Sequence, residues 1–251
     1  MTEHFLTPEQ LLEGQILLID KPLHWSSFQA VNKIKWSIIK NYKLKKIKIG
    51  HAGTLDPLAS GLLVICTGKF TKKITEFQDA LKNLHREPSD WGQPLRHSIW
   101  KQKLSKTFPI AHITPELIEQ VRQQFIGEIE QTPPVFSAIK REGKRLYELA
   151  REGEETIEVP KRIVQIQQFN IDISQFPDID FEVVCSKGTY IRSLANDLGK
   201  ALQSGAHLIA LRRTRIGDFL VENALSPDEF IQKYIPKRET NEKNKKVLQS
   251  D

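Results

Sequence analysis

A glycine-rich turn that leads into an apolar strand constrains the fold of this chain more than any other feature. Residues 50–61 read Gly-His-Ala-Gly-Thr-Leu-Asp-Pro-Leu-Ala-Ser-Gly, and an apolar run over 62–66 follows. Glycine permits backbone angles closed to other residues, and Pro57 biases Asp56 toward extended geometry. The apolar run predicts a buried strand. One carboxylate, Asp56, is therefore expected on a stiff turn, where it either faces a cleft or caps local amides.

The composition favours a globular protein with an anionic partner. The chain has 251 residues, of which 39% are apolar, so one large domain or two small ones can bury a sizeable core. Its formal net charge is +6, which indicates either a polyanionic partner or only a basic surface. Residues 1–13 lack the basic start and apolar centre of a signal peptide, and no apolar run is long enough to cross a membrane. We therefore expect a cytoplasmic protein with no membrane partner.

The two cysteines indicate neither a disulfide framework nor a metal site. Cys66 and Cys185 lie far apart in apolar stretches, without the paired Cys and His spacing that holds zinc. We expect two buried free thiols and no metal.

Helix caps and apolar runs predict a fold of class α+β, in which a mixed β-sheet has flanking helices. Patterns typical of a helix start follow Thr7, Ser26, Thr114 and Ser226. The helices are expected over 8–14, 27–40 and 115–125 and from 227 onward. Apolar runs predict strands over 15–20, 62–67, 159–173 and 179–185, and within 207–219.

Two further expectations concern one helix face and the end of the chain. In the helix over 27–40, the apolar face consists of Phe28, Val31, Ile34, Ile38 and Ile39. Residues 237–251 are almost wholly polar and charged, which predicts a flexible tail after a domain over 1–236.

Three groups of basic residues either bind phosphates or form solvated surfaces. They are Lys43, Lys45, Lys46 and Lys48 before the turn, Lys69 and Lys72 after its strand, and Lys140, Arg141, Lys144 and Arg145 around a glycine. The sequence does not distinguish these alternatives for any single lysine.

Three long segments carry a resemblance to a known family. They are the turn over 50–61, the segment 131–151 with Gln-Thr-Pro-Pro-Val-Phe-Ser-Ala at its start, and the segment 186–199 with Ser-Lys-Gly-Thr-Tyr-Ile-Arg at its start. Together they closely resemble the bacterial tRNA pseudouridine-55 synthases, which isomerise one uridine in the T-arm of tRNA. The resemblance implies the pseudouridine synthase fold, the T-arm stem-loop as partner, a monomer and no cofactor.

The resemblance also implies roles for five residues. Asp56 falls on the family's nucleophile, and Arg192 on the cation that keeps this carboxylate ionised. His51 corresponds to the wedge that fills the gap left by the flipped uridine, Tyr190 to a contact of the flipped base or its sugar, and Leu211 to an apolar wall. Without the resemblance, the residues alone favour a surface ion pair for Arg192, a structural role for His51 and a core position for Leu211.

Residues 81–104 depart from the family pattern. The family has a strand pair here with a Tyr that stacks on the target base, whereas this segment contains no tyrosine and is typical of neither a strand pair nor a helix. We hypothesise an out-of-frame translation. With one permitted choice of codons for 88–102, reading from the last base of the Pro88 codon gives Ile-Arg-Leu-Gly-Ala-Thr-Thr-Pro-Ser-Phe-Asp-Leu-Glu-Thr, which resembles the family's own segment. Resequencing of the gene tests this hypothesis.

The same departure supports a second hypothesis about function. A catalytically impaired protein that binds or remodels tRNA would keep the basic surfaces and the pocket without the reaction. The presence of Asp56 and Arg192 favours the enzyme, and the disrupted segment favours the binding protein.

Overall fold

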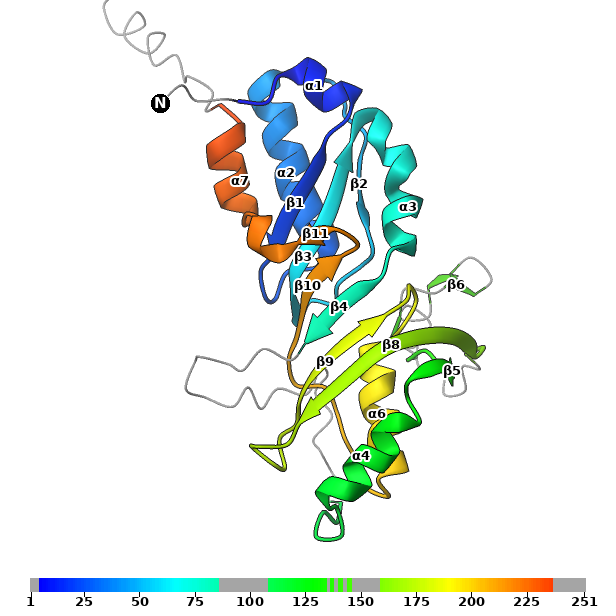
Figure 1. The fold of residues 1–251 in the computed structure, drawn as a ribbon. Helices are drawn as coiled ribbons and strands as arrows, with labels where there is room; N and C mark the ends of the chain where they lie inside the picture. Colours follow the sequence, from blue (N-terminus) through cyan, green and yellow to red (C-terminus); the bar gives the residue numbers. More distant parts are fainter. Residues whose placement is uncertain are drawn as a thin grey trace, which may run out of the picture.

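The computed structural model describes residues 5–85, 108–134, 136–137, 140–141, 144–145 and 159–236. These residues form one nine-stranded sheet with helices packed against it, and a separate two-stranded ribbon of β6 (Lys140–Arg141) and β7 (Lys144–Arg145) (Figure 1). The hypothesis about the tail concerns residues outside the described ones.

The sheet is mixed, as the sequence predicted. In spatial order its path is β1 (Ile16–Lys21), β3 (Ala59–Thr67), β10 (Leu211–Ile216), β4 (Lys82–His85), β9 (Asp180–Cys185), β8 (Arg162–Asp172) and β5 (Gly127–Gln131). Off this path, β2 (Ile49–Ala52) pairs with β3, and β11 (Phe219–Leu220) pairs with β10. The pairing of β10 with β3 is parallel, and the other named pairings are antiparallel.

Helices divide the molecule into two halves that share this sheet (Figure 1). The first half carries α1 (Pro8–Glu13), α2 (Ser27–Tyr42), α3 (Ile74–Asp79) and α7 (Pro227–Tyr234), with 3-10 turns at Gly68–Lys73 and Val221–Asn223. The second half carries α4 (Pro115–Gln123) and α6 (Ile191–Ala201), which cover β8 and β9. Separate apolar clusters fill the two halves, and β4 and β10 lie where the halves meet.

The helix caps form as the sequence predicted. Thr7, Ser26 and Ser226 each make a reciprocal capping box, and Thr114 accepts a hydrogen bond from the N–H of Leu117. Both cysteines are buried and free, which confirms that prediction. None of the described helices combines the length and the apolar composition needed to cross a bilayer.

The prediction for the apolar face of α2 is wrong at Phe28. Val31, Ile34 and Ile38 are buried, but Phe28 is 68% exposed. The buried positions of α2 are 27, 30, 31, 34 and 38, so Ser27 takes the first inward position and Phe28 lies outside the buried face.

Part of the segment 81–104 forms a strand although its sequence is not typical of a strand pair, because Lys82–His85 forms β4. Its residues pair with β9 on one side and with β10 on the other, and these neighbours supply hydrogen bonds that no local pattern reveals. The rest of that segment, from residue 86, lies outside the described residues.

Candidate functional site

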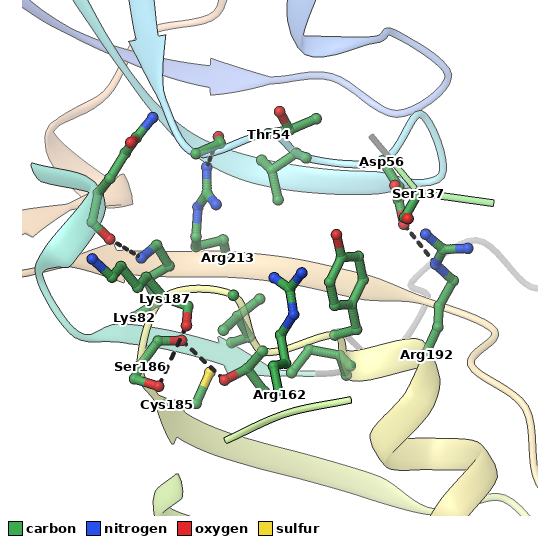
Figure 2. Close-up of a pocket in the computed structure, with 18 of the residues that line it drawn as sticks. Thr54, Asp56, Lys82, Ser137, Arg162, Cys185, Ser186, Lys187, Arg192 and Arg213 are labelled. Atoms are coloured by element: carbon green, nitrogen blue, oxygen red, sulfur yellow. Dashed lines mark hydrogen bonds and ion pairs between the residues drawn. The ribbon is translucent and has the colours of Figure 1, made fainter. Parts of the chain in front are cut away.

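A cavity of about 660 Å³ lies where the two halves of the sheet meet (Figure 2). Its described walls come from the Asp56 turn, β4, the start of β8, the turn over 185–189, the start of α6 and β10. Four of the five residues singled out in the sequence line it: Asp56, Tyr190, Arg192 and Leu211.

Asp56 and Arg192 form an ion pair at one end of this cavity. Arg192 Nε lies 2.8 Å from Asp56 Oδ2, and the guanidinium also donates from Nη2 to the carbonyl oxygen of Phe136 at 2.9 Å. Arginine does not lose its proton at accessible pH, so a fixed positive charge stands beside the carboxylate. The Asp56 side chain is 42% exposed and that of Arg192 is 17% exposed, so a molecule in the cavity can reach the acid.

The start of α2 and the segment just before it hold the Asp56 turn from one side. The buried Ser27 hydroxyl accepts a hydrogen bond from the N–H of Leu55 at 2.8 Å and donates to the carbonyl oxygen of Leu55 at 3.1 Å. The N–H of His24 donates to the carbonyl oxygen of Pro57 at 2.7 Å. Both neighbours of Asp56 are thus tied to the same segment, which limits the positions of the carboxylate.

Arg213 of β10 holds the turn from the other side. Its Nε donates to the carbonyl oxygen of Leu62 at 2.9 Å. Its Nη2 donates to the carbonyl oxygen of Gly53 at 3.1 Å (Figure 2). Gly61 pairs with Arg213 across the parallel strands at a φ of +101°, and a Cβ atom there would overlap the carbonyl oxygen of Arg213. The glycine at position 61 therefore permits β10 to approach the turn closely.

Tyr190 and Leu211 both line the cavity. The side-chain amide of Gln131 fixes the backbone of Tyr190: Oε1 accepts from its N–H at 2.7 Å, and Nε2 donates to its carbonyl oxygen at 3.1 Å. The Arg162 guanidinium carbon lies 5.8 Å from the centroid of the Tyr190 ring, a cation–π distance. Leu211 is the first residue of β10 and pairs with Ala59.

His51 is not brought together with the other four. It lies on β2 opposite Ile65, and the described walls of the cavity do not include it. Burial lowers the pKa of His51, and the nearby Arg213 charge lowers it further. A wedge role for His51 stays a prediction.

Sequence analysis missed two buried cations in the cavity wall, Lys82 and Arg213. Lys82 is 8% exposed, and its Nζ donates to the carbonyl oxygens of Gln78 at 2.8 Å and Ala80 at 3.1 Å. Burial lowers the pKa of Lys82 to about 8 and that of Arg213 to about 10. A weak signal existed for Arg213, because strand alternation places it on the same face as Leu211. A buried lysine is rare, and nothing in the sequence indicated one at position 82.

No group of three or more His, Cys, Asp or Glu side chains suited to a metal ion is present within the described ranges. The buried cationic groups of Lys82 and Arg213 in the cavity wall donate to backbone carbonyls. The arrangement offers a carboxylate with a fixed counter-charge, an aromatic ring and an apolar wall.

Two family profiles match the sequence, and the boundary between the two matched ranges lies in the wall of this cavity. Residues 40–191 match "TruB family pseudouridylate synthase (N terminal domain)", and residues 192–250 match "tRNA pseudouridylate synthase B C-terminal domain". Asp56 belongs to the first match, and Arg192 is the first residue of the second.

Curated relatives resemble the chain over nearly its whole length. It is 58% identical over 221 residues to tRNA pseudouridine synthase B of Flavobacterium johnsoniae, with 88% of this chain and 96% of the relative covered. It is 50% identical over 218 residues to tRNA pseudouridine synthase B of Phocaeicola vulgatus, with 87% and 92% covered.

Solved structures share the fold. A chain in the crystal structure of a Cbf5–Nop10–Gar1 complex matches with a TM-score of 0.61 and 27% identity, over 92% of this chain and 61% of that chain. A chain in the structure of an H/ACA RNP bound to a substrate RNA containing 2′-deoxyuridine matches with a TM-score of 0.58 and 25% identity, over 92% and 58%. The present chain thus spans about three fifths of the length of these two chains.

Proposed function

We propose that this chain, which belongs to the TruB family of pseudouridylate synthases and converts uridine in tRNA to pseudouridine, acts on the T-arm uridine at position 55 and uses Asp56 as its nucleophile. The observation that carries the proposal is the 2.8 Å ion pair between Asp56 and Arg192 in a cavity that also exposes Tyr190 and Leu211. These residues come from segments far apart in the sequence, so their meeting is a property of the fold.

The reaction needs no oxidant and no energy source. The bond between N1 of uracil and C1′ of ribose breaks, the base turns, and a bond between C5 and C1′ forms. The hydrogen on C5 leaves as a proton and N1 gains one, so atoms and electrons balance. An ionised carboxylate serves as the nucleophile toward the sugar or the ring, and Asp56 supplies it.

Arg192 is proposed to keep Asp56 anionic and correctly placed. Its guanidinium donates both to the carboxylate and to the Phe136 carbonyl, so it cannot rotate away without losing two contacts. Such a preorganised charge costs no rearrangement at the moment of reaction.

The target base must leave its stack before Asp56 can reach it. A cavity of about 660 Å³ falls within the range of roughly 300–1,000 Å³ typical of small-ligand pockets, so a flipped nucleotide fits in it. Tyr190 and Leu211 are proposed to contact the flipped base, and His51 is proposed to fill the gap in the RNA.

One observation favours the impaired tRNA-binding protein as a second candidate. In the described part of the segment 81–104, the residues of β4 that line the cavity are Lys82 and Leu84, and neither is aromatic. Loss of one base-stacking aromatic weakens binding by about 1–3 kcal/mol. Activity that survives with Leu84 in this wall would exclude this candidate.

The test is to incubate purified protein with unmodified tRNA transcript and to map pseudouridine by carbodiimide treatment and primer extension. We expect one modified position, in the T-arm, with wild type and with Asp228→Ala, whose carboxylate pairs with Lys33 outside the cavity wall. Asp56→Ala is expected to bind tRNA without modifying it. Modification elsewhere in the tRNA would overturn the T-arm assignment, and activity of Asp56→Ala would overturn the nucleophile.

A further inference from the structure

The end of the cavity away from Asp56 contains two buried cationic side chains. Arg213 is 3% exposed and Lys82 is 8% exposed, and both line the cavity. Figure 2 shows them, with Lys187, on the side opposite the Asp56–Arg192 pair. They come from neighbouring strands, because β10 pairs with β4.

Their hydrogen bonds leave donors free within the described part of the chain. Lys82 Nζ uses two of its three N–H groups, on Gln78 and Ala80, which leaves one. Arg213 uses two of its five, on Leu62 and Gly53, which leaves three. All four acceptors are neutral backbone carbonyls, so neither cation has a carboxylate partner there.

The charge around this pair is also unbalanced. Asp79 is the nearby acid, and it lies 2.6 Å from a third cation, Lys187 Nζ, at the exposed rim. Burial raises the pKa of the neighbouring Cys185 thiol, which keeps it neutral at pH 7. Three cations therefore face one anion among these residues. Buried charges in proteins are normally paired, so this corner is suited to an anionic ligand.

We propose that Lys82 and Arg213 form a subsite for a phosphate group of the RNA strand that carries the target uridine. The proposal rests on the function proposed above. Arginine offers a planar fork to phosphate oxygens and lysine adds a point charge, and the two occur here side by side on one wall.

The test measures the affinity for whole unmodified tRNA at NaCl concentrations from about 50 to 200 mM. Over this range of about fourfold, each phosphate contact is expected to lower the affinity by about threefold as salt rises. All proteins carry Asp56→Ala, so no turnover interferes. We expect that adding Lys82→Met makes the slope of log affinity against log salt shallower by about 0.7–0.9. Lys82→Arg should retain most of the slope, and Lys33→Met, outside the cavity wall, should leave it unchanged.

The outcomes separate the possible sources of phosphate. An unchanged slope with Lys82→Met would overturn the proposal, even if affinity falls, because it would assign Lys82 a structural role. Inorganic phosphate that binds wild type but not Lys82→Met, with an unchanged RNA slope, would assign the corner to free phosphate and overturn the RNA subsite. If Lys82→Met does not fold, a slope equal to wild type in the folded Lys82→Gln variant would overturn it.

The experiment does not depend on the T-arm assignment, because whole tRNA is used. A shallower slope together with modification outside the T-arm would keep the subsite and reject the proposed target. Modification of the T-arm together with an unchanged slope would keep the proposed target and reject the subsite.

Discussion

At one end of the cavity a carboxylate and a guanidinium lie 2.8 Å apart near the rim, whereas at the other end Lys82 and Arg213 are buried with only backbone carbonyls as described partners. At the first end the charges of Asp56 and Arg192 cancel, and hydrogen bonds from Ser27 and Arg213 hold the Asp56 turn from two sides. The second end carries uncompensated positive charge. This difference matches the division proposed above, in which the Asp56 end carries out the reaction and the Lys82 end holds a phosphate.

The largest expected effect is at the carboxylate. Asp56→Asn keeps the size of the side chain but removes its charge, so pseudouridine formation should fall by at least about 10³-fold, as expected for loss of a nucleophile. Affinity for tRNA should change by less than about threefold, because this end of the cavity is not expected to supply the binding charge. Single-turnover rates and equilibrium binding on the same samples check both statements. Equal losses in rate and affinity would contradict the division between the two ends.

Removal of the guanidinium should cost less than removal of the acid. Arg192→Met leaves Asp56 without its fixed counter-charge and should lower the single-turnover rate by about 10²-fold or more. Arg192→Lys restores a charge but lacks the planar fork that contacts Asp56 and the Phe136 carbonyl from two nitrogens, so it should recover only part of the rate. A full recovery with lysine would show that charge alone matters and that the twofold contact does not.

At the other end, a stability measurement sharpens the comparison. The pKa of Lys82 in the folded protein is lowered to about 8 from its ordinary 10.5, chiefly by burial, with Arg213 and Lys187 lowering it and Asp79 and Cys185 raising it. The protonated lysine therefore destabilises the fold fully below pH 8, and this penalty disappears as the pH rises toward 10.5. Lys82→Met should raise the free energy of unfolding at pH 7 by about 1–3 kcal/mol, and the gain should shrink at pH 9.5.

Urea unfolding at both pH values measures this effect. Lys187→Met serves as the control, because its pair with Asp79 is exposed and should contribute less than about 1 kcal/mol. A loss of stability at pH 7 in Lys82→Met would show that the two carbonyl contacts outweigh the cost of burial. The proposed subsite would then lose its support, because the proposal assumes that the buried Lys82 cation destabilises the fold in the absence of a ligand.

Much of the fold could be predicted from local signals. The capping boxes at Ser26 and Ser226 and the strand after the Asp56 turn depend on neighbouring residues, and they formed as expected. The strand at Lys82–His85 could not be predicted, because its hydrogen bonds come from β9 and β10, about 100 or more residues later in the chain.

The site residues also divide into those that the sequence indicated and those that only tertiary packing reveals. The motifs indicated Asp56, Arg192, Tyr190 and Leu211, and the structure brings these four together, although their roles stay proposals. The inward orientation of Lys82 and the two-sided support of the turn by Ser27 and Arg213 are properties of tertiary packing. Residue type alone favours a surface position for each of these polar side chains.

The smallest expected effect concerns how firmly the Asp56 end is held, and adjacent serines provide a matched comparison. Ser27→Ala leaves the buried N–H and carbonyl of Leu55 without their partner, so the free energy of unfolding should fall by about 1–3 kcal/mol and the single-turnover rate by about tenfold. Ser26→Ala removes the cap of α2 at a similar cost of about 1 kcal/mol, but Ser26 makes no described contact with the turn, so the rate should hold. Equal rates in the two variants would show that Asp56 keeps its position without Ser27, and the preorganisation assigned to this end would then depend on Arg213 and His24.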